Sequence, residues 1–95
     1  MARGIVSEKD LQTAAIRWAR ARGWFARRGA GAGRRSAPDY MLARQGRCIW
    51  VEFKKPGNEP TDLQRREHLE MRSYGLNVVW LDNLDDFKAV LSVNE

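Results

Sequence analysis

Cysteine and histidine are the scarcest reactive residues in this 95-residue chain, which contains one of each, Cys48 and His68. A single cysteine cannot form an intrachain disulfide, so a secreted fold held together by disulfides is excluded. Zinc sites that need several thiolates or imidazoles are excluded as well. His68 falls in a charged helical stretch, where we expect it to lie at the surface without a functional role.

Long apolar runs are also absent, and the longest cover only residues 48–51 and 78–81. A membrane-spanning helix needs roughly 20 apolar residues, and the first residues lack the apolar core of a signal peptide. We therefore expect a cytoplasmic protein with no membrane partner. Hydrophobic residues make up 43% of the sequence, so residues 1–95 are expected to form a single domain with one core.

Positive charge is abundant but unevenly distributed, with a net charge of +5. Residues 1–47 carry 11 basic and 3 acidic side chains, whereas residues 48–95 carry 6 basic and 9 acidic ones. Ten of the 11 basic residues in the first half are arginines, and a guanidinium group binds phosphate through two parallel hydrogen bonds. This asymmetry makes nucleic acid the leading class of partner. The alternative is a basic face that serves only solubility.

The segment 27–35 contains three glycines and no large apolar side chain, so we expect it to form a mobile loop. Two arginine pairs flank the glycines: Arg27 with Arg28, and Arg34 with Arg35. We expect these four arginines to contact DNA phosphates, because they precede a candidate site residue by only a few positions. The alternative is a flexible, solvated turn.

Capping residues and helical spacing of apolar residues predict three helices. They cover residues 8–22, residues 62–73 and a last segment that follows Asn83. Ser7 is a suitable N-cap for the first helix. Thr61 and Gln64 form a capping box for the second. We expect the four tryptophans to lie in the core.

Apolar runs between turn residues predict four strands, over residues 24–26, 40–43, 48–53 and 77–81. The second and third strands form a hairpin whose two-residue turn, Gln45-Gly46, places Asp39 opposite Glu52. Both faces of this hairpin are apolar apart from a few charged residues, so we expect other elements to cover both faces. The order α-β-β-β-α-β-α predicts an α/β fold with a mixed sheet flanked by helices.

Asp39, Glu52 and Lys54 are the charged residues of this hairpin, and the predicted register places them on one face. Two buried carboxylates side by side must take up a proton or a cation. Mg²⁺ prefers such oxygen ligands and lowers the pKa of a bound water, which Lys54 could orient. In the alternative interpretation, Lys54 neutralises Glu52 in an ion pair and Asp39 caps the turn after Pro38.

Two further residues could join this group. Glu8 lies on the helix face of Leu11 and Gln12, so it could supply a third carboxylate near the sheet; the alternative is a favourable charge at a helix N-terminus. Gln64 could contact a phosphate or a metal-bound water near the start of its helix, or it could serve only in the capping box.

These motifs together resemble a known family. Pro38-Asp39 followed by Glu52-Phe53-Lys54 resembles the signature of PD-(D/E)xK nucleases. The helices add further matching residues, which are Ser7-Glu8, Gln12, Trp18 and, after a loop with Pro56-Gly57, Gln64. With these residues the chain is similar to the VRR-NUC branch over about residues 7–91. That branch includes small stand-alone nucleases, many encoded by phages, and the nuclease module of a DNA crosslink repair enzyme.

The resemblance implies a restriction-endonuclease-like αβββαβ core with an added C-terminal helix, and Mg²⁺- or Mn²⁺-dependent hydrolysis of DNA phosphodiester bonds. It implies that Glu8, Asp39 and Glu52 hold the metal, that Lys54 is the catalytic lysine and that Gln64 is the motif glutamine. Stand-alone members resemble homodimers that act on branched DNA such as four-way junctions or flaps. A phage-encoded member would work in the host cytoplasm.

Two other functions remain open at this point. A basic module could bind nucleic acid without cutting it, in which case binding would be salt-dependent and unaffected by EDTA. A structural or regulatory subunit could instead use the acidic second half to bind a partner protein.

Overall fold

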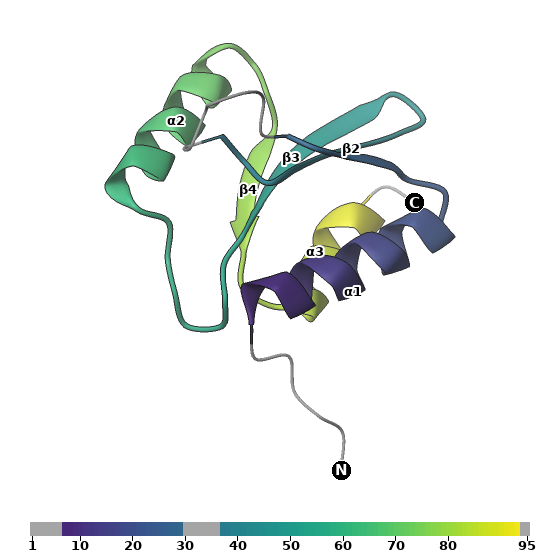
Figure 1. Ribbon diagram of the computed structural model, residues 1–95. Helices are drawn as coiled ribbons and strands as arrows, with labels where there is room; N and C mark the ends of the chain where they lie inside the picture. Colours follow the sequence, from purple (N-terminus) through teal and green to yellow (C-terminus); the bar gives the residue numbers. More distant parts are fainter. Residues whose placement is uncertain (1–6, 30–36, 94–95) are drawn as a thin grey trace.

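The computed structural model describes residues 7–29 and 37–93. The elements in chain order are α1 (Glu8–Ala21), β1 (Phe25–Arg28), β2 (Tyr40–Arg44), β3 (Arg47–Phe53), α2 (Asp62–Ser73), β4 (Val78–Leu81) and α3 (Leu84–Ser92). This order, and the sheet order β1-β2-β3-β4 with β4 parallel to β3 and the other pairs antiparallel, confirm the predicted α/β fold with a mixed sheet (Figure 1). Within the described ranges, no helix has the length and apolar character needed to cross a bilayer.

Helix α1 begins where its capping residue predicts. The Ser7 hydroxyl accepts a hydrogen bond from the Asp10 backbone N–H at 3.0 Å, which satisfies one of the free donors of the first turn. Leu11, Ala15 and Ala19 follow at four-residue spacing and are fully buried, so one stripe of the helix faces the core.

The β2–β3 hairpin has the predicted turn and register. Gln45 and Gly46 both have positive φ, 49° and 85°, as a two-residue type I′ turn requires. The register pairs Tyr40 with Val51 and Met41 with Trp50. Extending it by one residue places Asp39 beside Glu52, as predicted.

Strand β1 differs from its prediction, because it covers Phe25–Arg28 rather than residues 24–26. Arg27 and Arg28 therefore lie in a strand and not in a loop. The pairing extends because β2 offers partners as far as Tyr40, and the Gly29 N–H then donates to the Asp39 carbonyl at 2.8 Å. A Cβ at Gly29 would lie 2.6 Å from the Pro38 carbonyl oxygen, so only glycine fits this close approach.

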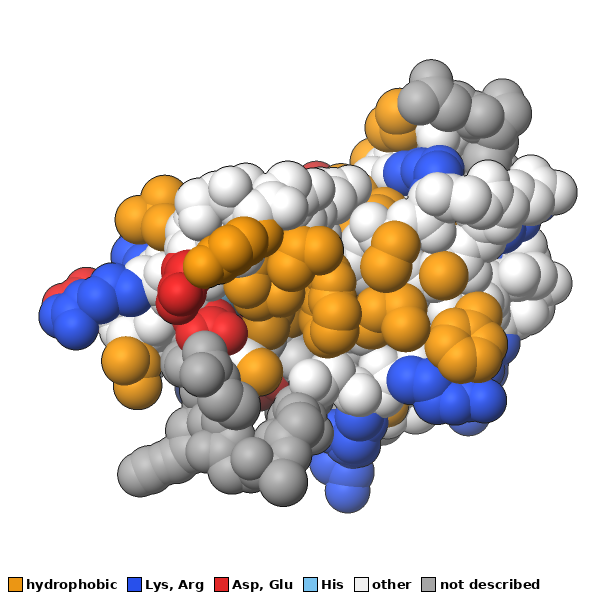
Figure 2. Space-filling model, turned by 90° about the horizontal axis from the view of Figure 1, so that it is seen from above, with side chains coloured by type: hydrophobic (Ala, Val, Ile, Leu, Met, Phe, Trp, Pro, Cys, Tyr) orange, Lys and Arg blue, Asp and Glu red, His pale blue; other side chains and the backbone are white. Residues whose placement is uncertain are grey.

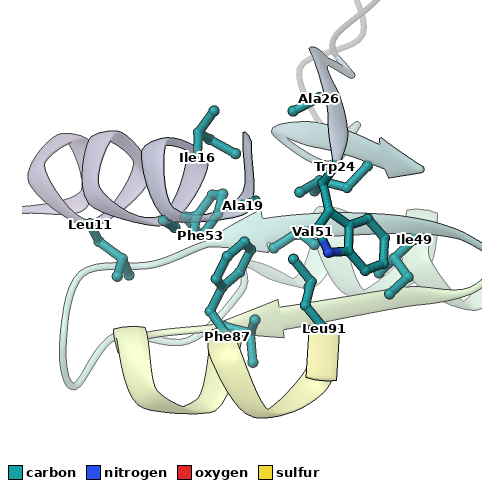
Figure 3. Packing of buried hydrophobic residues seen from close by; sticks show 13 residues of the cluster. Leu11, Ile16, Ala19, Trp24, Ala26, Ile49, Val51, Phe53, Phe87 and Leu91 are labelled. Atoms are coloured by element: carbon teal, nitrogen blue, oxygen red, sulfur yellow. The ribbon is translucent and has the colours of Figure 1, made fainter. Parts of the chain in front are cut away.

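Helices α1 and α3 lie side by side on one face of the sheet (Figure 1). The core between them and the strands contains Leu11 and Ile16 from α1, Phe87 and Leu91 from α3, and Leu42, Ile49, Val51 and Phe53 from the hairpin (Figure 3). The Phe53 and Phe87 rings have centroids 5.6 Å apart. This face supplies most of the buried apolar surface.

The opposite face of the sheet is covered only in part, which corrects the prediction that both faces of the hairpin are covered. Helix α2 packs against β4, while Met41 and Trp50 stay half-buried and Phe25 is 48% exposed. One helix, about 10 Å wide, covers roughly two strands spaced about 4.8 Å apart. Figure 2 shows a cluster of surface-exposed hydrophobic side chains on one face of the molecule. Of the four tryptophans expected in the core, Trp24 is buried and the other three are half-buried.

Candidate active site

The hairpin brings Asp39 and Glu52 together. Asp39 is fixed by the neighbouring strand, because its Oδ2 accepts a hydrogen bond from the Phe53 backbone N–H at 2.8 Å. The Glu52 side chain is only 2% exposed, and its carboxyl group lies within hydrogen-bond reach of the Asp39 carboxyl group. The two acidic groups predicted to share one face of the hairpin therefore form a contact pair.

This pairing changes the acidity of Glu52. Burial, followed by the negative charge of Asp39 and the contact between the two carboxyl groups, raises the pKa of Glu52 from 4.5 to about 8, although Lys54 acts in the opposite direction. A carboxylate in this environment is stable only when a proton or a cation compensates its charge. At neutral pH the raised pKa therefore favours the protonated form of Glu52.

Gln64 connects Glu52 with Lys54. The Gln64 Nε2 donates to Glu52 Oε2 at 3.2 Å, and the Gln64 Oε1 accepts from Lys54 Nζ at 3.2 Å. The same Oε1 accepts from the Thr61 N–H at 2.9 Å, and the Thr61 hydroxyl accepts from the Gln64 N–H at 3.1 Å. The predicted capping box is present, and its glutamine also reaches the site.

Lys54 does not form a close ion pair with Glu52, although its positive charge lowers the pKa of that carboxyl group. Among the residues that the structure describes, the ion pairs shorter than 4.0 Å do not include one between Lys54 and Glu52. The ammonium group is held by the Gln64 amide. Lys54 is half-buried at the end of β3. Its positive charge therefore lies near the carboxylate pair without a direct ion pair to Glu52.

Glu8 lies near the pair but is not packed into it. Burial and the charge of Asp39 raise the pKa of Glu8, and Lys54 opposes the rise, so Glu8 shares the electrostatic environment of the site. Over residues 7–29 and 37–93, however, no three His, Cys, Asp or Glu side chains are close enough to form a metal-binding group on their own. Asp39 and Glu52 are the two acidic side chains that the structure brings into contact here, and Glu8 is coupled to them through its charge.

His68 is the residue that the sequence analysis missed. It is 2% exposed rather than at the surface, and its Nε2 lies 3.7 Å from Glu52 Oε1. Neither of these two buried atoms has a hydrogen-bond partner among the described residues. Burial, followed by the charge of Arg72, lowers the pKa of His68, which favours the neutral imidazole. Its spacing of one helical turn from Gln64 could have revealed its position.

The four arginines expected to bind DNA divide into two groups. Arg27 and Arg28 are exposed on β1, and their side chains point to opposite faces of the sheet because strand residues alternate. The Arg27 guanidinium stacks over the Phe25 ring at 4.2 Å, and that of Arg28 lies 5.4 Å from the centroid of the Tyr40 ring. Arg28 is thus beside the residue that follows Asp39. Arg34 and Arg35 lie outside the described residues.

Comparisons with known proteins relate the sequence and the fold of this chain to nucleases. No family model matches the sequence. The chain is 33% identical over 91 residues to "Putative nuclease p44" of Acyrthosiphon pisum secondary endosymbiont phage 1, which covers 95% of this chain and 98% of that protein.

Two solved structures share the fold. A structure named "VRR_NUC domain" has a TM-score of 0.83 and 26% identity, and the match covers 96% of this chain and all of that one. A second, "VRR_NUC domain protein", has a TM-score of 0.74 and 21% identity over 94% of this chain and 87% of that one, which shows the fold alone. The fold, the order of the acidic residues and the relationship to a phage protein lead to one conclusion: this chain belongs to the VRR-NUC family of nuclease domains.

Proposed function

We propose that this protein is a metal-dependent DNA endonuclease that hydrolyses phosphodiester bonds. The observation that carries the proposal is the contact of the buried Glu52 with the half-buried Asp39, in which the pKa of Glu52 is raised to about 8. Such a pair lowers stability unless it binds a cation, so its presence beside a held lysine favours a catalytic role over a structural one.

The donor set fits a hard divalent cation. Asp39 and Glu52 offer carboxylate oxygens, and Glu52 Oε1 has no hydrogen-bond partner in the described part of the chain. Mg²⁺ and Mn²⁺ prefer oxygen ligands and often bind through two carboxylates, with water and substrate phosphate completing the shell. In this proposal Asp39 and Glu52 hold the ion directly, and Glu8 contributes through its charge or through a water.

Each side chain of the site then has a defined task. Bound Mg²⁺ or Mn²⁺ would polarise the phosphoryl group and make a water more acidic. Lys54 orients the attacking water or offsets the negative charge that develops on the phosphate. Gln64 holds both Lys54 and Glu52 in place through its amide. In the reaction the water oxygen bonds to phosphorus as the bond to the leaving oxygen breaks. The water gives up one proton to solvent and the leaving oxygen takes up one, so that protons balance.

We extend the proposal to the substrate and the assembly. The resemblance to small stand-alone VRR-NUC proteins favours branched DNA, either four-way junctions or flaps, and a homodimer. Two copies related by a two-fold axis would present two sites to the two arms of a junction. Residues 1–95 would act as one domain, and the phage relative favours work on DNA in the cytoplasm of a host.

A cleavage panel tests the proposal. Single-stranded, duplex, flap and four-way DNA are incubated with the purified protein in Mg²⁺, Mn²⁺ or EDTA, with size measured by sedimentation. We expect cleavage of the branched substrates in either metal, none in EDTA, and a mass of two chains. Salt-dependent binding without cleavage in any metal would instead identify a non-catalytic nucleic-acid-binding module.

A further inference from the structure

A basic groove runs along α1, outside the carboxylate site. It has a volume of about 440 Å³ and lies between α1 and the end of the β1–β2 pair. Its polar lining consists of Lys9, Gln12, Thr13, Arg17, Arg20 and Arg28. No acidic side chain lines it in residues 7–29 and 37–93. A concave surface with four cations and no described acidic residue attracts a polyanion.

The cations are arranged in a line. Lys9, Arg17 and Arg20 lie eight and then three residues apart, which places them on one stripe of the helix. Lys9 and Arg20 are separated by 11 helical steps, which span about 16 Å at 1.5 Å per step. This length corresponds to about five nucleotides at an axial rise of 3.4 Å per nucleotide.

Two guanidinium groups of the groove are held by neighbouring groups of the protein. Arg20 Nη2 donates to the Ala26 carbonyl at 3.0 Å, and the Arg28 guanidinium lies 5.4 Å from the Tyr40 ring centroid. These contacts fix two guanidinium groups beside β1 before any ligand arrives, so less side-chain entropy is lost on binding. Lys9 and Arg17 are exposed toward solvent.

One part of the groove lies close to the carboxylate pair. Lys9 directly follows Glu8, and Glu8 is close enough to Asp39 and Lys54 for their charges to shift its pKa. Arg28 pairs across the sheet with Tyr40, which directly follows Asp39. Carboxylates repel a phosphate backbone, and a cationic track beside them can hold the strand close enough for reaction.

We propose that this groove binds the sugar-phosphate backbone of the DNA strand on one side of the cut. Lys9 and Arg28 contact phosphates next to the scissile one, and Arg17 and Arg20 contact phosphates farther along. Recognition is by charge and does not read bases, so the groove contributes affinity without sequence preference. This inference rests on the proposed nuclease function for the position of the cut.

The test measures DNA binding in EDTA, where cleavage is not expected. Fluorescence anisotropy with a labelled DNA duplex and a labelled four-way junction gives Kd at several salt concentrations for the wild type, Arg17→Gln and a Lys9→Gln/Arg17→Gln double variant. Arg66→Gln is the matched control, because Arg66 is an exposed helical arginine of α2 that does not line the groove.

We expect Arg17→Gln to weaken binding by about 3- to 10-fold and to reduce the slope of log K against log salt by about 1. The double variant should reduce this slope by about 2. Arg66→Gln should change neither quantity. A wild-type Kd and salt slope in both Arg17→Gln and the double variant would contradict binding of DNA by the groove. An equal loss of affinity in Arg66→Gln would also contradict it, because the effect would then come from net charge alone.

Parallel cleavage assays separate this inference from the proposed function. If the wild type cleaves DNA while the groove variants bind normally, the groove assignment fails and the nuclease function stands. If the groove variants lose affinity while the wild type cuts no substrate in Mg²⁺ or Mn²⁺, the groove stands as a DNA-binding site and the nuclease function fails. Circular dichroism melting confirms that each variant is folded.

Discussion

The two faces of the β2–β3 hairpin differ in what covers them and in what they contribute. On one face Leu42 and Phe53 are fully buried beneath α1 and α3. On the other face Met41 and Trp50 are half-buried, and the polar network of Glu52 fills the region beneath α2. Neighbouring residues of the same strands therefore have different effects on stability. The side chains of one face stabilise the fold, whereas the charged side chains of the other face destabilise it.

The largest expected difference comes from two neighbours in β2. Leu42→Ala should lower the free energy of unfolding by about 2–5 kcal/mol, because it leaves a cavity in the core. Met41→Ala, on the open face, should lower it by less than about 1 kcal/mol. Urea denaturation of both variants measures this difference. Equal losses would show that both faces contribute equally to stability.

A change at Lys54 should affect activity rather than stability. We expect Lys54→Ala to lower kcat by about 10²- to 10³-fold, since a preorganised charge beside the reacting phosphate is lost. Lys55→Ala is the matched control, because Lys55 is its exposed chain neighbour. Single-turnover cleavage of a junction substrate in Mg²⁺ measures both. Wild-type rates in Lys54→Ala would remove this lysine from the mechanism.

Replacing Glu52 should stabilise the metal-free protein while abolishing cleavage. The pKa of Glu52 is raised to about 8 in the folded state, from 4.5, so the folded protein binds more protons than the unfolded chain between these values. Stability should therefore fall as pH rises from about 5 to about 8. Glu52→Gln removes this term, and we expect it to gain on the order of 1–3 kcal/mol at pH 8.

Thermal and urea unfolding of the wild type and Glu52→Gln across this pH range, without metal, provides the measurement. The difference between the two proteins should grow from pH 5 to pH 8, and millimolar Mg²⁺ should narrow it by binding only the wild type. A difference that is independent of pH would contradict the raised pKa of Glu52.

The smallest expected effect separates two helix caps. Thr61 caps α2 and Asn83 caps α3, each accepting a hydrogen bond from a backbone N–H three residues later. Thr61→Ala and Asn83→Ala should each cost about 1 kcal/mol of stability. Only Thr61→Ala should also lower kcat several-fold, because Gln64 loses part of its support. An equal fall in kcat for both would indicate a general effect of stability.

Turn and capping residues in the sequence predicted the parts of the site whose positions depend on neighbouring residues in the chain. The Gln45-Gly46 turn fixes the register of the hairpin, and that register is enough to place Asp39 beside Glu52. Thr61 and Gln64 likewise predict the start of α2. The extent of β1 was mispredicted because its length is set by partners in β2 and by the close approach at Gly29, which are tertiary features.

The position of His68 and the open face of the sheet also depend on tertiary packing. Charged neighbours on α2 indicate a surface position for His68, yet the helix places it against Glu52. Hydrophobic strands indicate cover on both faces, yet among the described elements a single helix, α2, packs on the second face. The metal-binding roles of Glu8, Asp39 and Glu52 remain predictions from sequence and chemistry.

The double role of Gln64 has a consequence for when the enzyme becomes competent. The side-chain amide of Gln64 caps the N-terminus of α2 and also holds Lys54 and Glu52, which the proposed reaction needs, by hydrogen bonds. Fraying of the first turn of α2 would release both at once, long before the remaining structure unfolds. A newly made chain with its hairpin already paired would thus stay harmless to DNA until α2 has docked.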